Sequence, residues 1–367
     1  MTAVSELPSP RSGEHTLAVA VGLVSFVALY LTSGAIDNDH FVIYARAMQV
    51  LGGDWPVRDF EDPGMPVAYL AQALVAWVFG ASLLVNVVFS VALIALTAGL
   101  TYLLAARACG QRWLALVVTA VTVAVAPRLY NATKVLVPIV AISLAWTYAE
   151  RPTARHAVWM GVWAGIAGLL RYDYLVYVLS TDVMLVISLH PRNVAVGRAA
   201  LCVAVAAVCV APWLVFVQRA EGLSTYFSTA LAFVAAEGRR TAGTPSRALY
   251  LAAMALPLVG LARAWTMPPS IARYRLGTVA LLTLLTALVL LRDNLGTRAP
   301  DVLPLYAVLT TALADRLPGA ATGRALGAAL VAGIVVLTIA TGRLSWSRLS
   351  SLSAFGGQAG RVTERLR

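Results

Sequence analysis

Charged side chains are scarce in this chain. Asp, Glu, Lys and Arg together make up 12% of its 367 residues, whereas a soluble domain carries about 25%. Hydrophobic residues reach 60%, and the mean hydropathy is +0.79. The length would suffice for two soluble domains, but this composition excludes them. A helix that crosses a bilayer needs about 20 mostly apolar residues. Many such runs follow one another here, so the sequence predicts an all-α, polytopic transmembrane helical bundle.

Lysine is almost absent, because Lys134 is the only one among 28 basic residues and the rest are Arg. So strong a skew indicates GC-rich bacterial coding, and we expect a multi-pass protein of the bacterial inner (plasma) membrane. The net charge of +11 is scattered over many short loops. It forms no continuous stripe of the kind that nucleic-acid binding requires. Membrane lipids, and no nucleic acid, are therefore the expected partners of the basic residues.

Cysteine is also rare, and three residues supply neither a disulfide framework nor a metal site. Cys202 and Cys209 stand seven apart on one apolar run, about 10 Å along a helix, which exceeds disulfide reach. We expect them to pack in the core. The sequence contains no HExxH, CxxC or Walker-type motif and no Ser-His-Asp arrangement. Its first apolar run is too long for a cleaved signal peptide and lacks a clear small-residue cleavage site.

The apolar runs predict about eleven membrane spans. They lie near 16–35, 82–106, 113–127, 135–149, 157–170, 174–189, 199–218, 248–264, 276–291, 301–314 and 324–341. The chain then divides into a cytoplasmic N-terminal tail (1–15), a membrane domain (16–342) and a short C-terminal tail (343–367). The run at 65–79 is shorter and contains Gln72, so we interpret it as an interfacial or re-entrant segment. Basic residues are equally numerous on the loops of the two sides, so the positive-inside rule favours neither orientation strongly.

The first loop, 36–64, is rich in acids. Asp37, Asn38 and Asp39 stand where the first span ends, and the spacing predicts a short helix from about 40 to 51 that ends at Gly52 and Gly53. Its predicted apolar face, suited to the membrane interface, consists of Phe41, Tyr44, Ala45 and Met48. Two interpretations of the acids stand side by side. One makes them a helix cap and a solvated loop, and the other a general base or ligands of a divalent metal. A lone histidine at a helix start, His40, is expected to be a polar surface residue.

Alternate loops of a multi-span protein lie on the same side of the membrane, and we describe such loops as having the same parity. Further polar residues stand on loops of the same parity as this acidic loop. Arg171 and Asp173 interrupt an otherwise apolar stretch, and they form either a structural ion pair or part of a site. The others are Arg128, Tyr130, Asn131, Lys134, Arg292, Asp293, Arg298 and Asp301. Charges at the membrane boundary are costly and indicate function. One face of the bundle thus combines carboxylates suited to acid–base chemistry with Arg and Lys suited to a phosphate.

These motifs resemble the GT-C class of membrane glycosyltransferases, which use polyprenyl-phosphate sugars. The likeness is to the bacterial set related to protein O-mannosyltransferases and lipid A aminoarabinose transferases. The matching features are the acids after the first span, an A-x-x-L-x-G-like run at 47–53, P-x-R-D-F at 56–60, D-P-G-x-P at 62–66, Tyr69, F-G-A-S at 79–82, R-x-D at 171–173, A-P-W at 211–213, and an Arg followed by L-P-L-Y-A at 303–307. Two departures are Asn38, in place of the second acid of an adjacent pair, and the absence of a lysine before a P-P-L run.

The resemblance implies interfacial helices in an extracytoplasmic first loop and an inverting sugar transfer to a glycan, lipid or protein acceptor. Asp37 is the better match to the catalytic base, with Asp39 second, and both could hold Mg²⁺ or Mn²⁺. The cations expected to hold the donor phosphate are Arg58, Arg128, Lys134, Arg171 and Arg298. Supporting roles are expected for Asp59, Asp62, Tyr69 and Asp173. The alternatives are a polytopic lipid or solute transporter and a non-catalytic scaffold of the same fold.

Overall fold

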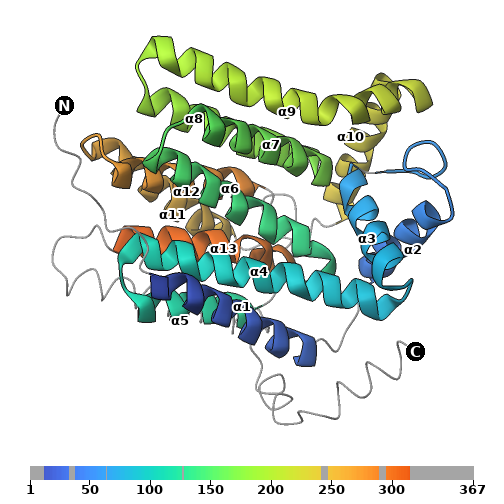
Figure 1. The fold of residues 1–367 in the computed structure, drawn as a ribbon, viewed down its shortest axis with the longest axis horizontal. Helices are drawn as coiled ribbons and strands as arrows, with labels where there is room; N and C mark the ends of the chain where they lie inside the picture. Colours follow the sequence, from blue (N-terminus) through green and yellow to red (C-terminus); the bar gives the residue numbers. More distant parts are fainter. Residues whose placement is uncertain are drawn as a thin grey trace.

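The computed structural model describes residues 12–32, 38–62, 64–125, 128–240, 247–288 and 295–314 (Figure 1). Their regular structure is helical apart from one isolated bridge between Pro56 and Phe60, which confirms the predicted all-α class. The helices are α1 Ser12–Thr32, α2 Asn38–Leu51, α3 Pro66–Phe79, α4 Leu83–Cys109, α5 Arg112–Ala124, the 3-10 turn η1 Leu129–Asn131, α6 Ala132–Glu150, α7 Ala154–Leu170, α8 Tyr172–Leu189, α9 Arg192–Ala220, α10 Leu223–Arg240, α11 Arg247–Thr266, α12 Ile271–Ala287 and α13 Leu295–Ala314.

Five helical stretches in these ranges are long and apolar enough to cross a membrane. They are Gly13–Leu31, Leu83–Cys109, Leu129–Glu150, Tyr172–Leu189 and Arg192–Ala220. Large apolar side chains remain exposed on them, such as Val24 and Val208, and lipid would cover these surfaces. Trp113, Trp159 and Trp265 are also exposed. The predicted number of about eleven spans stays a prediction. The last of these spans, 324–341, lies outside the described residues.

Small residues bring α7 and α9 together, and the two helices lie side by side in Figure 1. A methyl group added at Gly161 would lie 2.5 Å from the Cys202 carbonyl oxygen, and one at Gly165 would lie 2.5 Å from the Cys209 side chain. Spacing of small residues by four allows this close backbone approach between membrane helices. Cys202 is buried, as predicted, and Cys209 is half-buried; both are free thiols.

The ends of α4, α6 and α12 meet at an ion-pair network. The Glu150 carboxylate accepts hydrogen bonds from both Arg107 and Arg275. Trp146, fully buried, donates from its indole N–H to the Arg275 carbonyl oxygen at 3.1 Å. Arg107 and Glu150 lie at the ends of α4 and α6, and Lys134 lies at the opposite end of α6.

The segment predicted at 65–79 forms α3, whose 14 residues are fewer than a span requires. Its buried Gln72 accepts a hydrogen bond from the Asn86 side chain of α4 and lies 3.5 Å from the Ser90 hydroxyl oxygen. Trp77 and Phe79 on the same helix remain exposed. The helix therefore packs on the bundle through a polar contact and presents aromatic side chains outward.

Helix α2 confirms the short helix predicted in the first loop, and its end at Gly52 and Gly53 is also as predicted. The expectation for His40 was wrong, because its side chain is 1% exposed. His40, Ile43 and Ala47 share the buried face at helical spacing. Phe41, on the face predicted to lie in the membrane interface, is 44% exposed. Helical spacing in α2 is compatible with burial of either the His40 face or the Phe41 face. Packing against neighbouring elements determines which one is buried.

Candidate functional site: a basic cluster beside the acidic first loop

Three basic residues from separate parts of the chain meet at one end of the bundle. Lys134 lies in the first turn of α6, Arg171 is the single residue between α7 and α8, and Arg298 lies near the start of α13. The Tyr174 hydroxyl donates to the Lys134 carbonyl oxygen at 3.0 Å, which holds the start of α8 against that of α6. The Asn131 side-chain amide donates to both oxygens of Asp301 at 3.0 and 3.1 Å, which ties α13 to η1. We name Lys134, Arg171, Asp173, Arg298 and Asp301 the basic cluster.

The cations of the basic cluster differ in how they are paired. Arg171 makes two hydrogen bonds of 2.7 Å to the Asp173 carboxylate. Arg298 lies 3.8 Å from an Asp301 oxygen. Lys134 forms no hydrogen bond or ion pair with a described side chain, and its ammonium lies over the Tyr130 ring at 5.2 Å. It nevertheless lies within electrostatic range of the other four members. Three cations face two carboxylates, so the cluster has a formal charge of +1.

Asn131 and Arg128 extend the basic cluster toward the loop before α6. Asn131 is fully buried, and its Oδ1 has no hydrogen-bond partner among the described residues. Arg128 donates to the Tyr130 hydroxyl at 3.3 Å. The sequence marked Asn131 and Asp301 as polar but assigned them no role. Asn131 stands three residues before Lys134, a spacing that places two side chains on one helix face.

Asp39 lies near this end of the bundle. It occupies the first turn of α2 and is exposed. Helix α2 packs against η1, and the Asp39 charge acts on Tyr130, the residue over which the Lys134 ammonium lies. The structure thus brings one acid of the first loop close to the basic cluster. Asp37, the preferred base, lies outside the described residues.

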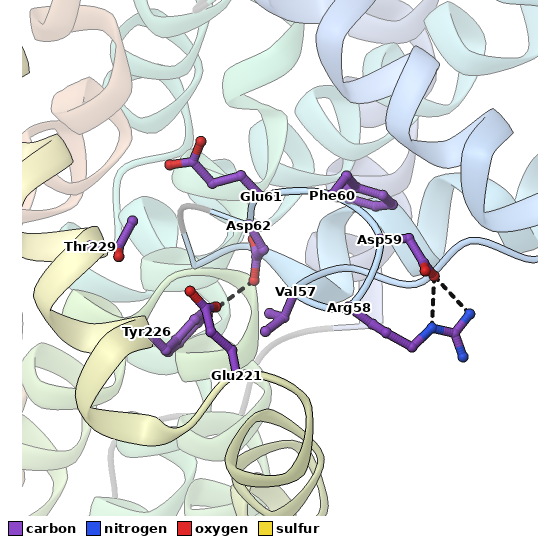
Figure 2. Close-up of a pocket in the computed structure, with 9 residues that line it drawn as sticks. All are labelled: Val57, Arg58, Asp59, Phe60, Glu61, Asp62, Glu221, Tyr226 and Thr229. Atoms are coloured by element: carbon purple, nitrogen blue, oxygen red, sulfur yellow. Dashed lines mark hydrogen bonds and ion pairs between the residues drawn. The ribbon is translucent and has the colours of Figure 1, made fainter.

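Arg58, Asp59 and Asp62 belong to a different place, an acidic hollow between the first loop and α10. Figure 2 shows its lining, which consists of Val57, Arg58, Asp59, Phe60, Glu61, Asp62, Glu221, Tyr226 and Thr229. Arg58 is bound to the Asp59 carboxylate and the Gly53 carbonyl oxygen, not to the basic cluster. The Arg58 hydrogen bond lowers the pKa of Asp59. Four carboxylates against one cation make this hollow unsuited to a phosphate.

Asp62 ties the first loop to α10. Its side chain is buried, and it accepts hydrogen bonds from the backbone N–H groups of Gly64 and Met65 and from the Tyr226 hydroxyl at 3.0 Å. Burial raises the pKa of this carboxyl, and the three donors oppose the rise. With its oxygens occupied in this way, Asp62 positions the loop.

The turn before Asp62 is held in an unusual backbone conformation. Val57 has φ 72°, which is costly for a β-branched residue. Its N–H donates to the Phe60 carbonyl oxygen at 2.8 Å, and the Trp55 N–H donates to the Asp59 carboxylate at 2.7 Å. Phe60 in turn packs edge-on against buried Tyr69, with ring centroids 5.9 Å apart. Tyr69 therefore supports the loop from α3.

Gly64 packs the acidic loop against Tyr172, the first residue of α8, which follows Arg171. Its φ is +99°, and a methyl group built there would lie 1.7 Å from the Tyr172 ring. We expect Gly64→Ala to lower the free energy of unfolding by about 3 kcal/mol or more, through backbone strain and this overlap. Gly53→Ala is the matched control, because Gly53 has φ +100° with open space around it. Thermal unfolding in detergent should show the larger loss for Gly64→Ala, and equal losses would contradict the contact with Tyr172.

A buried acid that the sequence reasoning missed lies inside a candidate span. Asp182 is in the middle of α8, 2% exposed, and no described residue forms a hydrogen bond or an ion pair with it. Its charge acts on Cys202 of α9. An acid within an apolar span was the available signal, and Asp182 stands well inside the run 174–189.

No group of three metal-ligating side chains lies together among the described residues. Because Asp37 is outside the described residues, a metal at Asp37 and Asp39 stays a prediction.

The fold and this site define an all-α protein with membrane-spanning helices and a polar, net-positive cluster at one end of its bundle. No protein-family model, curated protein or solved structure matches the chain. The likeness to GT-C enzymes therefore rests on the sequence motifs.

Proposed function

We propose that the chain is a membrane glycosyltransferase that moves a sugar from a polyprenyl-phosphate donor to a hydroxyl or amine of a lipid, glycan or protein acceptor. The observation that carries the proposal is the meeting of Lys134, Arg171 and Arg298 at one end of an apolar bundle. An ammonium with no carboxylate partner among the described residues and a guanidinium, both at the end of an apolar bundle, suit a phosphate attached to a long apolar chain. The reaction would take place on the extracytoplasmic face of a bacterial inner membrane.

The proposed chemistry is a displacement at the anomeric carbon. Asp37 or Asp39 removes the proton from the acceptor as its oxygen or nitrogen attacks. The bond between the anomeric carbon and the phosphate oxygen breaks, and the configuration inverts. The donor is a phosphodiester with one negative charge, and the departing polyprenyl phosphate carries two. The excess positive charge of the basic cluster would stabilise the charge that develops on the leaving group.

The donor supplies the activation in this proposal, so no nucleotide is needed. Mg²⁺ or Mn²⁺ bound by Asp37 and Asp39 would assist by offsetting charge near the acceptor. The prenyl chain would lie along the apolar helix surfaces, where lipid contacts the bundle.

Lipids that co-purify with the protein test the proposal. We expect mass spectrometry to find polyprenyl phosphate or its glycosylated form enriched in the wild-type preparation. Arg298→Gln should reduce this enrichment at least tenfold, since a hydrogen bond between charged groups contributes about 1.5–3 kcal/mol. Arg58→Gln is the matched control and should leave it unchanged, because Arg58 is bound to Asp59 in the acidic hollow. Absence of any prenyl phosphate from the wild type, in membranes that contain it, would contradict the proposal.

A transporter is the second candidate, and Asp182 is the observation that favours it. A carboxyl buried within a span is a frequent site of proton coupling. A transporter would move its substrate across vesicles without a covalent product, and this movement would depend on an ion gradient and on Asp182. A glycosyltransferase would form a glycosylated product in detergent, where no gradient exists.

A further inference from the structure

Asp173 fills the binding face of the guanidinium of Arg171. The Nε donates to Oδ1 and an Nη to Oδ2, both at 2.7 Å. This is the two-pronged geometry with which arginine also holds a phosphate. The guanidinium stacks over the Tyr174 ring at 5.4 Å, and the two paired side chains are 17% and 27% exposed. Arg171 therefore cannot offer the same pair of donors to a phosphate while Asp173 remains in place.

Lys134 of the basic cluster is not held in this way. Its ammonium has no carboxylate partner among the described residues. A phosphate that approached Lys134 would thus find the nearby Arg171 already hydrogen-bonded to Asp173. Binding at full strength requires the phosphate oxygens to replace the Asp173 carboxylate.

The position of Asp173 lowers the free-energy cost of this replacement. Asp173 lies in the first turn of α8, and no side chain caps this helix. Free backbone N–H groups and the helix dipole stabilise a carboxylate at that position. Arg171 is the only residue between α7 and α8 and has an extended backbone. Asp173 can therefore remain stabilised by its own helix after Arg171 has turned to a ligand.

We infer that Asp173 is a built-in competitor of the phosphate for Arg171 and sets the affinity of the basic cluster for prenyl phosphates. The inference rests on the proposed function, since it takes the ligand to be a prenyl phosphate. The competition weakens the hold on the ligand and so favours release of the polyprenyl phosphate product.

Binding of farnesyl phosphate to the purified full chain in detergent tests the inference, with farnesol as the uncharged control. We expect Asp173→Asn to lower the Kd about tenfold, because it frees charged hydrogen bonds worth at least that factor. Asp173→Glu retains the carboxylate and should keep the Kd near that of the wild type. Asp59→Asn, which frees exposed Arg58 in the same manner, should have no effect. Thermal unfolding of each variant shows that it is folded.

The double variant Arg171→Gln/Asp173→Asn separates competition from simple repulsion. If Asp173 acts by occupying Arg171, the gain in affinity should vanish relative to Arg171→Gln alone. A gain that persists in the absence of Arg171, or a folded Asp173→Asn variant with unchanged or weaker binding, would overturn the inference. A wild type and Asp173→Asn that both bind farnesyl phosphate no better than farnesol would instead overturn the proposed phosphate site itself.

Discussion

Lys134→Gln is expected to lower the turnover of sugar transfer by about a thousandfold. Loss of one preorganised donor to a developing anion costs about 10²–10³ in turnover, and here a full charge is also removed. Lys134 is the cation of the basic cluster that has no carboxylate partner among the described residues. It can therefore respond fully to the second negative charge that forms on the leaving phosphate. The measurement is the rate of product formation at saturating prenyl-phosphate sugar in detergent.

The same substitution should leave the fold intact. The hydrogen bond from Tyr174 goes to the backbone carbonyl of Lys134 and survives any change of side chain. Lys134→Arg keeps the charge and should recover a substantial part of the rate, which a loss of packing would not explain. A folded Lys134→Gln variant with wild-type turnover would show that the basic cluster does not hold the leaving group.

Replacing the catalytic carboxylate of the first loop is expected to reduce transfer by about 10²–10⁴. Asp37→Ser and Asp39→Ser are the informative variants. Serine caps a helix about as well as aspartate but cannot serve as a base at neutral pH. The interpretation of these acids as a cap and solvated loop predicts near-normal activity for both variants, whereas the catalytic interpretation predicts that one of them is severely impaired.

The two positions can also be told apart. Asp39 is exposed at the start of α2 and acts on Tyr130 beside the basic cluster, whereas the sequence resemblance favours Asp37. Whichever Ser variant loses activity identifies the base, and its unfolding temperature should match that of the other. If Asp37→Ala and Asp39→Ala, expressed at normal levels, both retain full transfer in membranes, the proposed function is wrong.

Local patterns predicted individual helices well where apolar runs were bounded by charge or glycine. The short helix α2 and its end at Gly52 and Gly53 are examples. Local patterns failed for His40, because helical spacing defines more than one face of α2, and packing against neighbouring elements determines which face is buried. Asp182 was not predicted as a functional candidate, because it lies within an apolar run. Such a run indicates a membrane span, and its single carboxyl does not change that pattern.

The phosphate-binding candidates show the same division. Alternate loops lie on one side of a membrane, which predicts that Lys134, Arg171 and Arg298 lie on the same side of the bundle, and they do meet in space. Arg58 satisfied the same criterion yet lies in the acidic hollow, bound to Asp59. The parity of a loop predicts on which side of the membrane it lies. It does not predict which residues on that side are neighbours.

The sequence by itself determined that this chain is an all-α protein with apolar helices, because charge content and the length of apolar runs are properties of local sequence. It also identified the acids and cations that stand at the helix ends. Only the tertiary structure decided which of them come together. The contacts that assemble the basic cluster join Asn131 to Asp301 and Tyr174 to Lys134. Their partners are separated by whole helices, so helix packing, which no local pattern encodes, brings them into contact.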